Sequence, residues 1–459
     1  MIVHVVGKEL ILSLRKDLKW QIQKVAVILL TFKNILSDGI LHENSEDNLE
    51  LLITNLKSKK EWLHSQKIDD LLDYFISLGN HWKNSTGRNF GNNLNHVSEF
   101  LSRENLEKEL KISLRGNFLA LDNFVNLFGD EKFLYHAQPR GISVHWIAGN
   151  VDVLGIFSVV QALLTKNLCL IKAPHNYSLL KNLILSFNEV STEKISGTDL
   201  LNCITLVYVD RNDLSNQAIL SENADIRIAW GGEEAVSTIL SLKKNFFTED
   251  IIYGPKYSYA ILDSEFLKDN LKNATQRLAL DISIFDQYAC NSPHTIFIEN
   301  NDTDNPSLVK DFAKELSNSM ETVNRLMLPK SKISEKKSME ILSLRTEYDF
   351  KGEVFAPKNT DWTVIYSEEE GLANPCSSRV VFVRPIKNAE EIAKFHNRKI
   401  QSIGIGISDH ERRKKLVDLI TLLGGDRCPS VGNMSKFHSP WDGIFGMDRM
   451  VRWISMTNE

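Results

Sequence analysis

Strand-like and helical segments alternate between residues 141 and 258, and this alternation constrains the fold more than any other feature of the chain. Helical patterns at residues 153–164 and 178–187 follow the first two strand-like runs. Parallel strands that are buried on both faces have continuous apolar runs, and helices connect them. We therefore predict an α/β fold in which a Rossmann-type, doubly wound parallel sheet forms one domain. The four apolar runs of strand length are residues 143–148, 168–172, 204–209 and 226–230.

Polar residues and glycines stand at the ends of these predicted strands, where the ligands of doubly wound sheets bind. Asn150 could cap a helix N-terminus or could donate its amide hydrogens to an oxyanion. Lys172 is either an ordinary solvated lysine or a ligand contact. Trp230 leads into Gly231-Gly232, which form a turn before a helix or let a cofactor pyrophosphate approach the helix N-terminus. The full G-x-G-x-x-G fingerprint is absent, so the residues alone leave these alternatives open.

A second α/β domain is predicted after Lys256, because a strand pattern restarts at residues 259–262. We place a domain boundary near residue 258. The chain then divides into four predicted regions: an N-terminal helical region (1–85), a nucleotide cofactor-binding domain (86–258), a catalytic domain that carries a cysteine (259–430) and a C-terminal tail (431–459). The tail is expected to pack back on the cofactor domain or to form an oligomer interface.

Cys290 is the candidate catalytic residue of the second domain. It stands in a short polar stretch between a helical pattern at residues 271–285 and a strand-like run at residues 295–298. Cysteine is most often a small buried hydrophobe, and Cys169 and Cys203, in or beside apolar strands, fit that interpretation. The neighbours of Cys290 are polar instead, which favours an exposed thiol held between two rigid elements. Such a thiol can act as a covalent catalyst.

Composition and charge exclude several classes of function. The chain has 459 residues, 42% of them apolar and 25% charged, and a net charge of −5, so neither nucleic acid nor an anionic membrane is an expected partner. Its five cysteines show no disulfide framework and no metal-ligand spacing, which suits a reducing cytosol. No signal peptide and no membrane-spanning apolar run are recognised. We therefore expect a cytoplasmic protein without a metal site.

Taken in order, several segments resemble the aldehyde dehydrogenase superfamily. Within it they closely resemble the LuxC-type long-chain acyl-CoA reductases of bacterial luminescence systems. The resemblance covers about residues 70 to 455 and implies an aldehyde dehydrogenase-like fold. The most specific matching segment is the Asp-Gln-x-x-Cys-x-Ser-Pro stretch around Cys290. The matching segments are residues 139–151, 163–172, 224–236, 285–293 and 440–443.

The resemblance assigns roles to individual residues. Cys290 matches the nucleophile, and Asn150 matches the asparagine that holds the oxyanion together with a backbone N–H. Lys172 matches the lysine that contacts the adenosine ribose. The segment Trp230-Gly231-Gly232 matches the start of the helix beneath the cofactor pyrophosphate. The group that activates the thiol is not identified by the sequence, and His145, His294 and Lys172 are candidates.

One departure from the superfamily pattern concerns hydrolysis. Aldehyde dehydrogenases that release acids carry a glutamate that activates water, whereas this chain has Ile252 at the matching position. The resemblance therefore implies reduction of an acyl thioester through an S-acyl enzyme to a fatty aldehyde. It also implies NADPH as the cofactor, an acyl-CoA or acyl-protein substrate, a partner acyl-protein synthetase and a homo-oligomer.

Three other functions fit parts of the sequence. An NAD(P)-dependent aldehyde dehydrogenase would share the fold, although Ile252 argues against it. A cysteine acyltransferase would use Cys290 without a redox step. A non-catalytic binding subunit would make the cysteine incidental.

Overall fold

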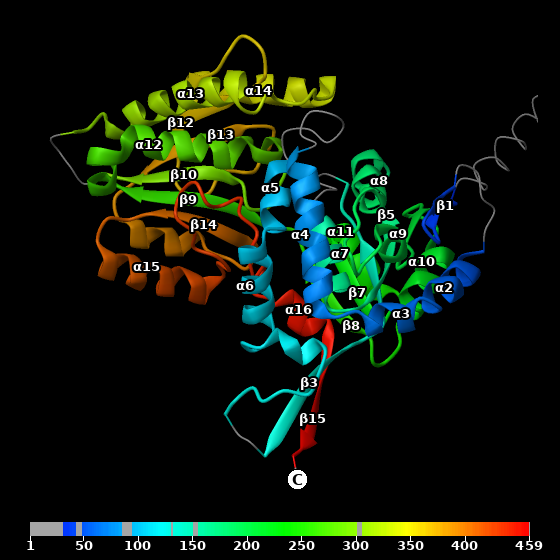
Figure 1. Ribbon diagram of the computed structural model, residues 1–459. Helices are drawn as coiled ribbons and strands as arrows, with labels where there is room; N and C mark the ends of the chain where they lie inside the picture. The colour runs from blue at the N-terminus through cyan, green and yellow to red at the C-terminus, as the bar shows by residue number, and fades with distance from the viewer. Residues whose placement is uncertain are drawn as a thin grey trace, which may run out of the picture. The chain divides into compact units, whose positions relative to one another are not determined.

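The computed structural model describes residues 31–42, 48–84, 94–129, 132–149, 155–300 and 305–458 (Figure 1). The chain forms two compact units. The first unit comprises residues up to Leu78, Asn117–Ile252 and Met447–Glu459, and the second comprises Gly79–Gly116 and Tyr253–Gly446. The division of the chain into the four regions expected from the sequence remains a prediction.

A seven-stranded sheet forms the centre of the first unit as far as the described residues show, in the order β2-β1-β6-β5-β4-β7-β8. The strands β5 and β7 flank β4 in parallel, and β6 continues the parallel arrangement beyond β5. The four strands expected from the apolar runs are thus confirmed as β4 to β7. The bounds are β1 Phe32–Ser37, β2 Ile40–Leu41, β4 Ile142–Trp146, β5 Leu168–Ala173, β6 Ile204–Val209, β7 Ile226–Trp230 and β8 Glu249–Tyr253.

Helices connect these parallel strands. The helix α7 is buried at every position, which explains why its sequence is apolar all round. The helix α10 begins where the carboxylate of Asp213 accepts the backbone N–H of Asn216. The bounds are α7 Gly155–Leu164, α8 Ser178–Leu185, η3 Ser186–Glu189, α9 Gly197–Leu201, α10 Leu214–Glu222 and α11 Glu233–Ser241.

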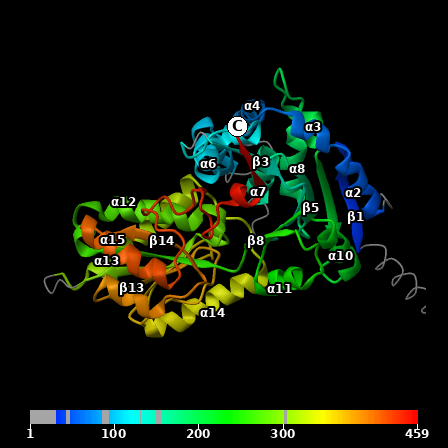
Figure 2. The same ribbon diagram turned by 90° about the horizontal axis from the view of Figure 1, so that it is seen from below.

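Within the N-terminal region expected to be helical, the described residues contain the helices α2, α3 and α4, but residues 32–37 form a strand; residues 1–30, 43–47 and 85 lie outside the described residues. The strand at residues 32–37 is β1, which pairs antiparallel with β6, the last of the parallel strands on this side of the sheet. Both views show α2 beside β1 at this edge of the sheet (Figure 1 and Figure 2). The buried Asn34 in β1 donates to the hydroxyl of Ser37 at 2.9 Å, so sheet pairing accommodates polar residues that a local pattern does not mark as a strand. The helix bounds are α2 Leu49–Lys57, α3 Lys60–Ser65 and α4 Ile68–Asn84.

A two-stranded ribbon completes the first unit. The strand β15 (Val451–Thr457), near the end of the chain, pairs antiparallel with β3 (Phe133–Pro139) along seven residues. The short helices η1 (Phe118–Leu121) and α16 (Gly446–Arg449) precede these two strands. The side-chain amide of Asn167 donates to the carbonyl of Met450 at 3.1 Å and so ties the ribbon to the end of α7.

A six-stranded sheet forms the second unit, in the order β11-β12-β13-β10-β9-β14 among the described residues. All neighbours are parallel except β11, which pairs antiparallel with β12. This confirms the second α/β domain. The bounds are β9 Tyr257–Asp263, β10 Pro293–Glu299, β11 Gly352–Phe355, β12 Thr363–Ser367, β13 Val380–Ile386 and β14 Ile400–Gly406.

Helices cover both faces of this second sheet (Figure 1). On one face, Ala260 and Ile296 pack against α12 and α13 through Leu278 and Phe312. On the other face, α15 packs on the sheet through Leu416. The bounds are α5 Leu94–Phe100, α6 Arg103–Ser113, α12 Ser264–Ser283, η4 Ile284–Gln287, α13 Leu308–Leu326, α14 Glu335–Lys351, η5 Ala389–Phe395 and α15 His410–Leu423.

Candidate active site

Cys290 lies in the loop between η4 and β10 of the second unit, as the sequence predicts. The short helix η4, which leads into this loop, contains three consecutive non-glycine residues in the left-handed backbone region, Phe285, Asp286 and Gln287, with φ of 53°, 50° and 65°. Such a conformation costs roughly 1–3 kcal/mol per residue and persists only where the surroundings hold it. The structure therefore has to anchor this loop.

Two buried side chains provide the anchors. The amide of Gln287 donates to the carbonyls of Pro293 and Val380 at 2.8 and 2.9 Å, and its oxygen accepts the N–H of Val380 at 2.8 Å. The carboxylate of Asp286 forms a 2.6 Å ion pair with Arg379, in which the side chains are 10% and 2% exposed. Both the amide nitrogen and the amide oxygen of Gln287 are thus hydrogen-bonded, and these bonds fix the loop to β13.

The backbone of Cys290 is held by a different strand. The hydroxyl of Ser258 donates to the Cys290 carbonyl at 2.7 Å and accepts the N–H of Ser402 at 3.0 Å. The next residue, Asn291, donates its amide to the carbonyl of Met434 at 2.8 Å. The polar residues around the cysteine therefore anchor the loop, and they are buried. This differs from the expectation of an exposed polar loop, since Cys290 itself is only partly exposed.

Three side chains of the second unit act on the Cys290 thiol. Burial raises the pKa of the thiol to about 12, and the nearby carboxylate of Asp442 raises it further, whereas a hydrogen bond from Gln401 and the charge of Arg427 lower it. Burial also raises the pKa of Asp442 to about 6, and a hydrogen bond from Gln401 partly offsets this rise. That hydrogen bond, from the Gln401 amide to Oδ1 of Asp442, is 2.5 Å long. A carboxylate, an amide and a cation thus surround the thiol.

The guanidinium of Arg427 is held rigidly in this cluster. It donates to the hydroxyl of Ser402 at 3.2 Å and to the carbonyls of Met434 and Lys436 at 3.4 and 2.7 Å. Its carbon Cζ lies 4.3 Å from the centre of the Trp441 ring, a stacking that favours a cation. Arg427 therefore supplies a fixed positive charge beside the residues that flank Cys290.

The two histidines that could have activated the thiol are buried and neutral. Burial lowers the pKa of His145 to about 3 and that of His294 to about 4. His145 lies within β4 of the first unit, where its ring nitrogens contact the hydroxyls of Ser143 and Ser158 at 2.9 and 3.1 Å. Both ring nitrogens of His145 therefore have hydrogen-bond partners, and the residue belongs to the core of the first unit.

The candidate cofactor residues lie together at the carboxyl ends of the strands in the first unit. Lys172 is partly buried near the end of β5, where burial lowers the pKa of its ammonium and the charge of Asp210 opposes that shift. Trp230 ends β7, and its indole donates to the hydroxyl of Ser158 at 3.2 Å. Asn150 lies outside the described residues.

The two glycines after β7 leave room for a ligand. Gly232 is the N-cap of α11, and none of the described side chains caps that helix. A Cβ added at Gly232 would meet nothing within 4 Å, whereas one at Gly231 would lie 3.2 Å from Ala235. Open backbone N–H groups at a helix N-terminus suit a pyrophosphate, although Glu233 and Glu234 in the first turn oppose a negative charge. The open approach at Gly232 is thus the feature of this helix start that fits a dinucleotide pyrophosphate.

Comparison with known proteins identifies the family. A family model described as "Acyl-CoA reductase (LuxC)" matches residues 54–453. The chain belongs to the acyl-CoA reductase (LuxC) family. A "Long-chain acyl-protein thioester reductase" from Aliivibrio fischeri is 29% identical over 325 residues, which are 70% of this chain and 64% of that protein. One from Photorhabdus laumondii is 25% identical over 415 residues, 85% of this chain and 82% of that protein. The match thus spans less than two thirds of the Aliivibrio protein.

Solved structures show the fold of this LuxC-family chain. Aldehyde dehydrogenase 21 from Physcomitrella patens, in complex with succinate, aligns with a TM-score of 0.66 and 12% identity over 92% of this chain and 97% of its own. A 3,6-anhydro-L-galactose dehydrogenase in complex with NAP aligns with a TM-score of 0.60 and 11% identity over 93% of this chain and 96% of its own. The predicted aldehyde dehydrogenase-like fold is confirmed.

The sequence did not mark two residues of this candidate site. Gln401 lies inside the apolar strand β14 and Arg427 in an irregular segment after α15, and neither has a local signal. Asp442 stands in a matching segment, but no role was assigned to it. In the part of the chain that the structure describes, no group of three or more His, Cys, Asp or Glu side chains could hold a metal ion, and no helix is both long and apolar enough to cross a bilayer.

Proposed function

We propose that this chain is an acyl thioester reductase, which transfers an acyl group to Cys290 and reduces it to an aldehyde. The observation that carries the proposal is the anchored loop that presents Cys290 to Gln401, Arg427 and Asp442. A rigidly held thiol with a carboxylate and a cation beside it suits nucleophilic catalysis. The names of the relatives, long-chain acyl-protein thioester reductases, support the same reaction.

The first step is acylation of the cysteine. The Cys290 thiol gives its proton to the Asp442 carboxylate, and the thiolate attacks the carbonyl carbon of the thioester. Transfer of this proton removes the negative charge that raises the thiol pKa, so the two groups titrate as a coupled pair. Arg427 stabilises the thiolate through its charge. The sulfur of the acyl donor leaves as a thiolate, which takes a proton from solvent, and an S-acyl enzyme remains with the first proton on Asp442.

Asn150 and the backbone N–H of Cys290 are proposed to hold the oxyanion of this step. Loss of one such donor typically lowers turnover by roughly 10²–10³-fold. Asn150→Ala should therefore slow acylation by that factor. The unfolding free energy should fall by much less than the activation free energy of acylation rises. Equal losses of stability and activity would contradict this role.

The second step is reduction of the acyl thioester. A nicotinamide dinucleotide, when bound, supplies the hydride, and NADPH is the proposed form. Lys172, Trp230, Gly231 and Gly232 would hold it in the first unit. The Cys290 thiolate then leaves, takes its proton back from Asp442 and frees the aldehyde.

Ile252 has no proton-accepting group, so it cannot activate water at the position where hydrolytic relatives of this fold carry a glutamate. An S-acyl enzyme of this chain should therefore exchange its acyl group with thiols faster than it is hydrolysed. The proposed substrates are long-chain acyl groups on CoA or on a protein thiol. A synthetase that supplies acyl-protein, assembly as a homo-oligomer, a cytoplasmic location and a role in luminescence belong to the same proposal.

The proposal is tested by mixing the purified chain with a long-chain acyl-CoA and NADPH. We expect oxidation of NADPH in proportion to the fatty aldehyde formed, and no reaction with Cys290→Ser. Acyl transfer to a thiol without any nicotinamide requirement would indicate an acyltransferase instead. Release of acid from an aldehyde with NAD and no CoA would indicate a hydrolytic dehydrogenase.

A further inference from the structure

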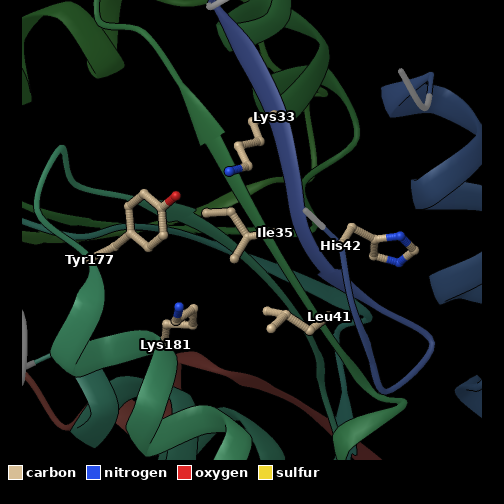
Figure 3. Close-up of a pocket in the computed structure, with 6 residues that line it drawn as sticks. All are labelled: Lys33, Ile35, Leu41, His42, Tyr177 and Lys181. Atoms are coloured by element: carbon tan, nitrogen blue, oxygen red, sulfur yellow. The ribbon is translucent and has the colours of Figure 1, made fainter. Parts of the chain in front are cut away.

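A pocket in the first unit lies between β1 and α8 and has a volume of about 150 Å³. Its base is the apolar Ile35, and Leu41 contributes a second apolar contact (Figure 3). The polar groups that point into it are two ammonium groups and a phenol, whereas the imidazole of His42 turns away from them and contacts the hydroxyl of Ser37 at 3.0 Å (Figure 3). The six lining residues are Lys33, Ile35, Leu41, His42, Tyr177 and Lys181.

The pocket concentrates positive charge. The ammonium of Lys33 and the hydroxyl of Tyr177 point toward one another above Ile35, and Lys181 points toward the same residue from α8 (Figure 3). No described residue forms an ion pair with Lys33 or Lys181. Two cations that share a concave site repel each other, and an anion between them relieves that repulsion.

Two carboxylates lie close in sequence to the strands β1 and β6, and both have partners other than the pocket lysines. Asp38, in the turn after β1, forms a 2.9 Å ion pair with Lys59. Asp210, after β6, accepts the backbone N–H of Asn212 at 2.9 Å, and its charge acts on Lys172. The two pocket lysines therefore keep their charge available for a ligand.

Sheet register connects this pocket with the proposed cofactor site. Lys33 of β1 pairs with Tyr208 of β6, and Tyr208 pairs with Ala173 of β5, the residue after Lys172. Lys33 thus lies two strand spacings, or roughly 10 Å, from the end of β5. In dinucleotide-binding sheets, an acidic residue near this strand end selects a free ribose 2′-hydroxyl, and a cation accommodates a 2′-phosphate. Residues 172–177 contain no Asp or Glu, and the acidic residue whose charge reaches Lys172, Asp210, follows the neighbouring strand β6.

We propose that this pocket binds a phosphate dianion, with Lys33, Lys181 and Tyr177 as its donors, and that the 2′-phosphate of the dinucleotide is its source. The second part rests on the proposed function, because only a dinucleotide-dependent reductase needs that phosphate. The apolar floor and the two ammonium groups suit a compact anion with an organic substituent. Inorganic phosphate offers the same chemistry without the nucleoside.

Calorimetric titration of the full chain with adenosine 2′,5′-bisphosphate, 5′-AMP and inorganic phosphate tests the proposal. The wild-type chain should bind the bisphosphate more tightly than AMP. Lys33→Ala and Lys181→Ala should each weaken bisphosphate binding by roughly tenfold, the usual scale for one charge-assisted hydrogen bond, and leave AMP binding unchanged. Lys194→Ala, an exposed lysine of the same unit that does not line the pocket, is the matched control.

Unchanged affinity for all three probes in both pocket variants would overturn the proposal. Loss of inorganic phosphate binding alone would support the phosphate site and assign free phosphate as its source. Tyr177→Phe should weaken binding of the bisphosphate less than either lysine variant does, since it removes a neutral hydrogen-bond donor. These titrations need no acyl substrate, so a chain that binds the bisphosphate but reduces no thioester would refute only the proposed reaction.

Discussion

Gln401 donates a hydrogen bond of 2.5 Å from its side-chain amide to the Asp442 carboxylate, and the same side chain hydrogen-bonds the Cys290 thiol. One amide on β14 therefore connects the candidate nucleophile with a carboxylate. This carboxylate belongs to the same unit as the cysteine. The arrangement places a carboxylate where the proposed mechanism needs a proton acceptor for the thiol.

Asp442→Asn should slow acylation of Cys290 by about 10²-fold or more at neutral pH, the lower range for loss of a general base. Asparagine keeps the contact with Gln401 but cannot accept the proton. The deficit should shrink as the pH rises, because the thiol then ionises without help. Single-turnover acylation followed by mass spectrometry measures this rate, and a wild-type rate at neutral pH would exclude the role.

The pH dependence of stability offers a separate test of Asp442. Burial raises its pKa from 3.8 to about 6, so between these values the folded protein holds a proton that the unfolded chain has released. The stability that this group contributes is complete below pH 3.8 and is lost as the pH rises through 6. The slope is at most about 1.4 kcal/mol per pH unit. Urea unfolding of wild type and Asp442→Asn across this window should differ by that slope, and parallel curves would contradict the burial effect.

The sequence predicted the parallel strands because each is buried and therefore apolar along its whole length. It failed at β1, where Lys33, Asn34 and Ser37 interrupt the apolar pattern. Burial of this segment depends on pairing with β6, about 170 residues later, which local periodicity does not contain.

The site could be predicted only in part for the same reason. Polar residues around Cys290 correctly indicated a loop between a helix and a strand. They did not reveal that Gln287 is anchored to Val380 or that Gln401 joins the thiol to Asp442, since these contacts join distant segments. The candidate nucleophile could thus be named from its neighbours in sequence, whereas the groups that set its pKa became apparent only in the folded chain.

Arg379→Met should destabilise the second unit by roughly 3–5 kcal/mol, because it leaves Asp286 buried without its partner. The double variant with Asp286→Asn should lose less than the sum of the two single variants. Urea denaturation monitored by circular dichroism measures each value. Replacement of the exposed Lys268, which pairs with Glu265, serves as the control and should change little. Additive losses would show that the ion pair does not hold the loop.

Cys290 should be the cysteine that carries the acyl group. Cys169 is fully buried in β5, and burial raises the pKa of its thiol to about 12. The Cys290 thiol has a similarly raised pKa, so the pKa does not separate the two. They differ because Cys290 is partly exposed and has a carboxylate and a cation beside it. After incubation with a long-chain acyl-CoA and no nicotinamide, peptide mass spectrometry should find a hydroxylamine-labile acyl group on Cys290. Cys169→Ala should be acylated at the wild-type rate, whereas Cys290→Ala should remain unmodified. An acyl group on another cysteine, or none on the wild-type chain, would refute the covalent mechanism.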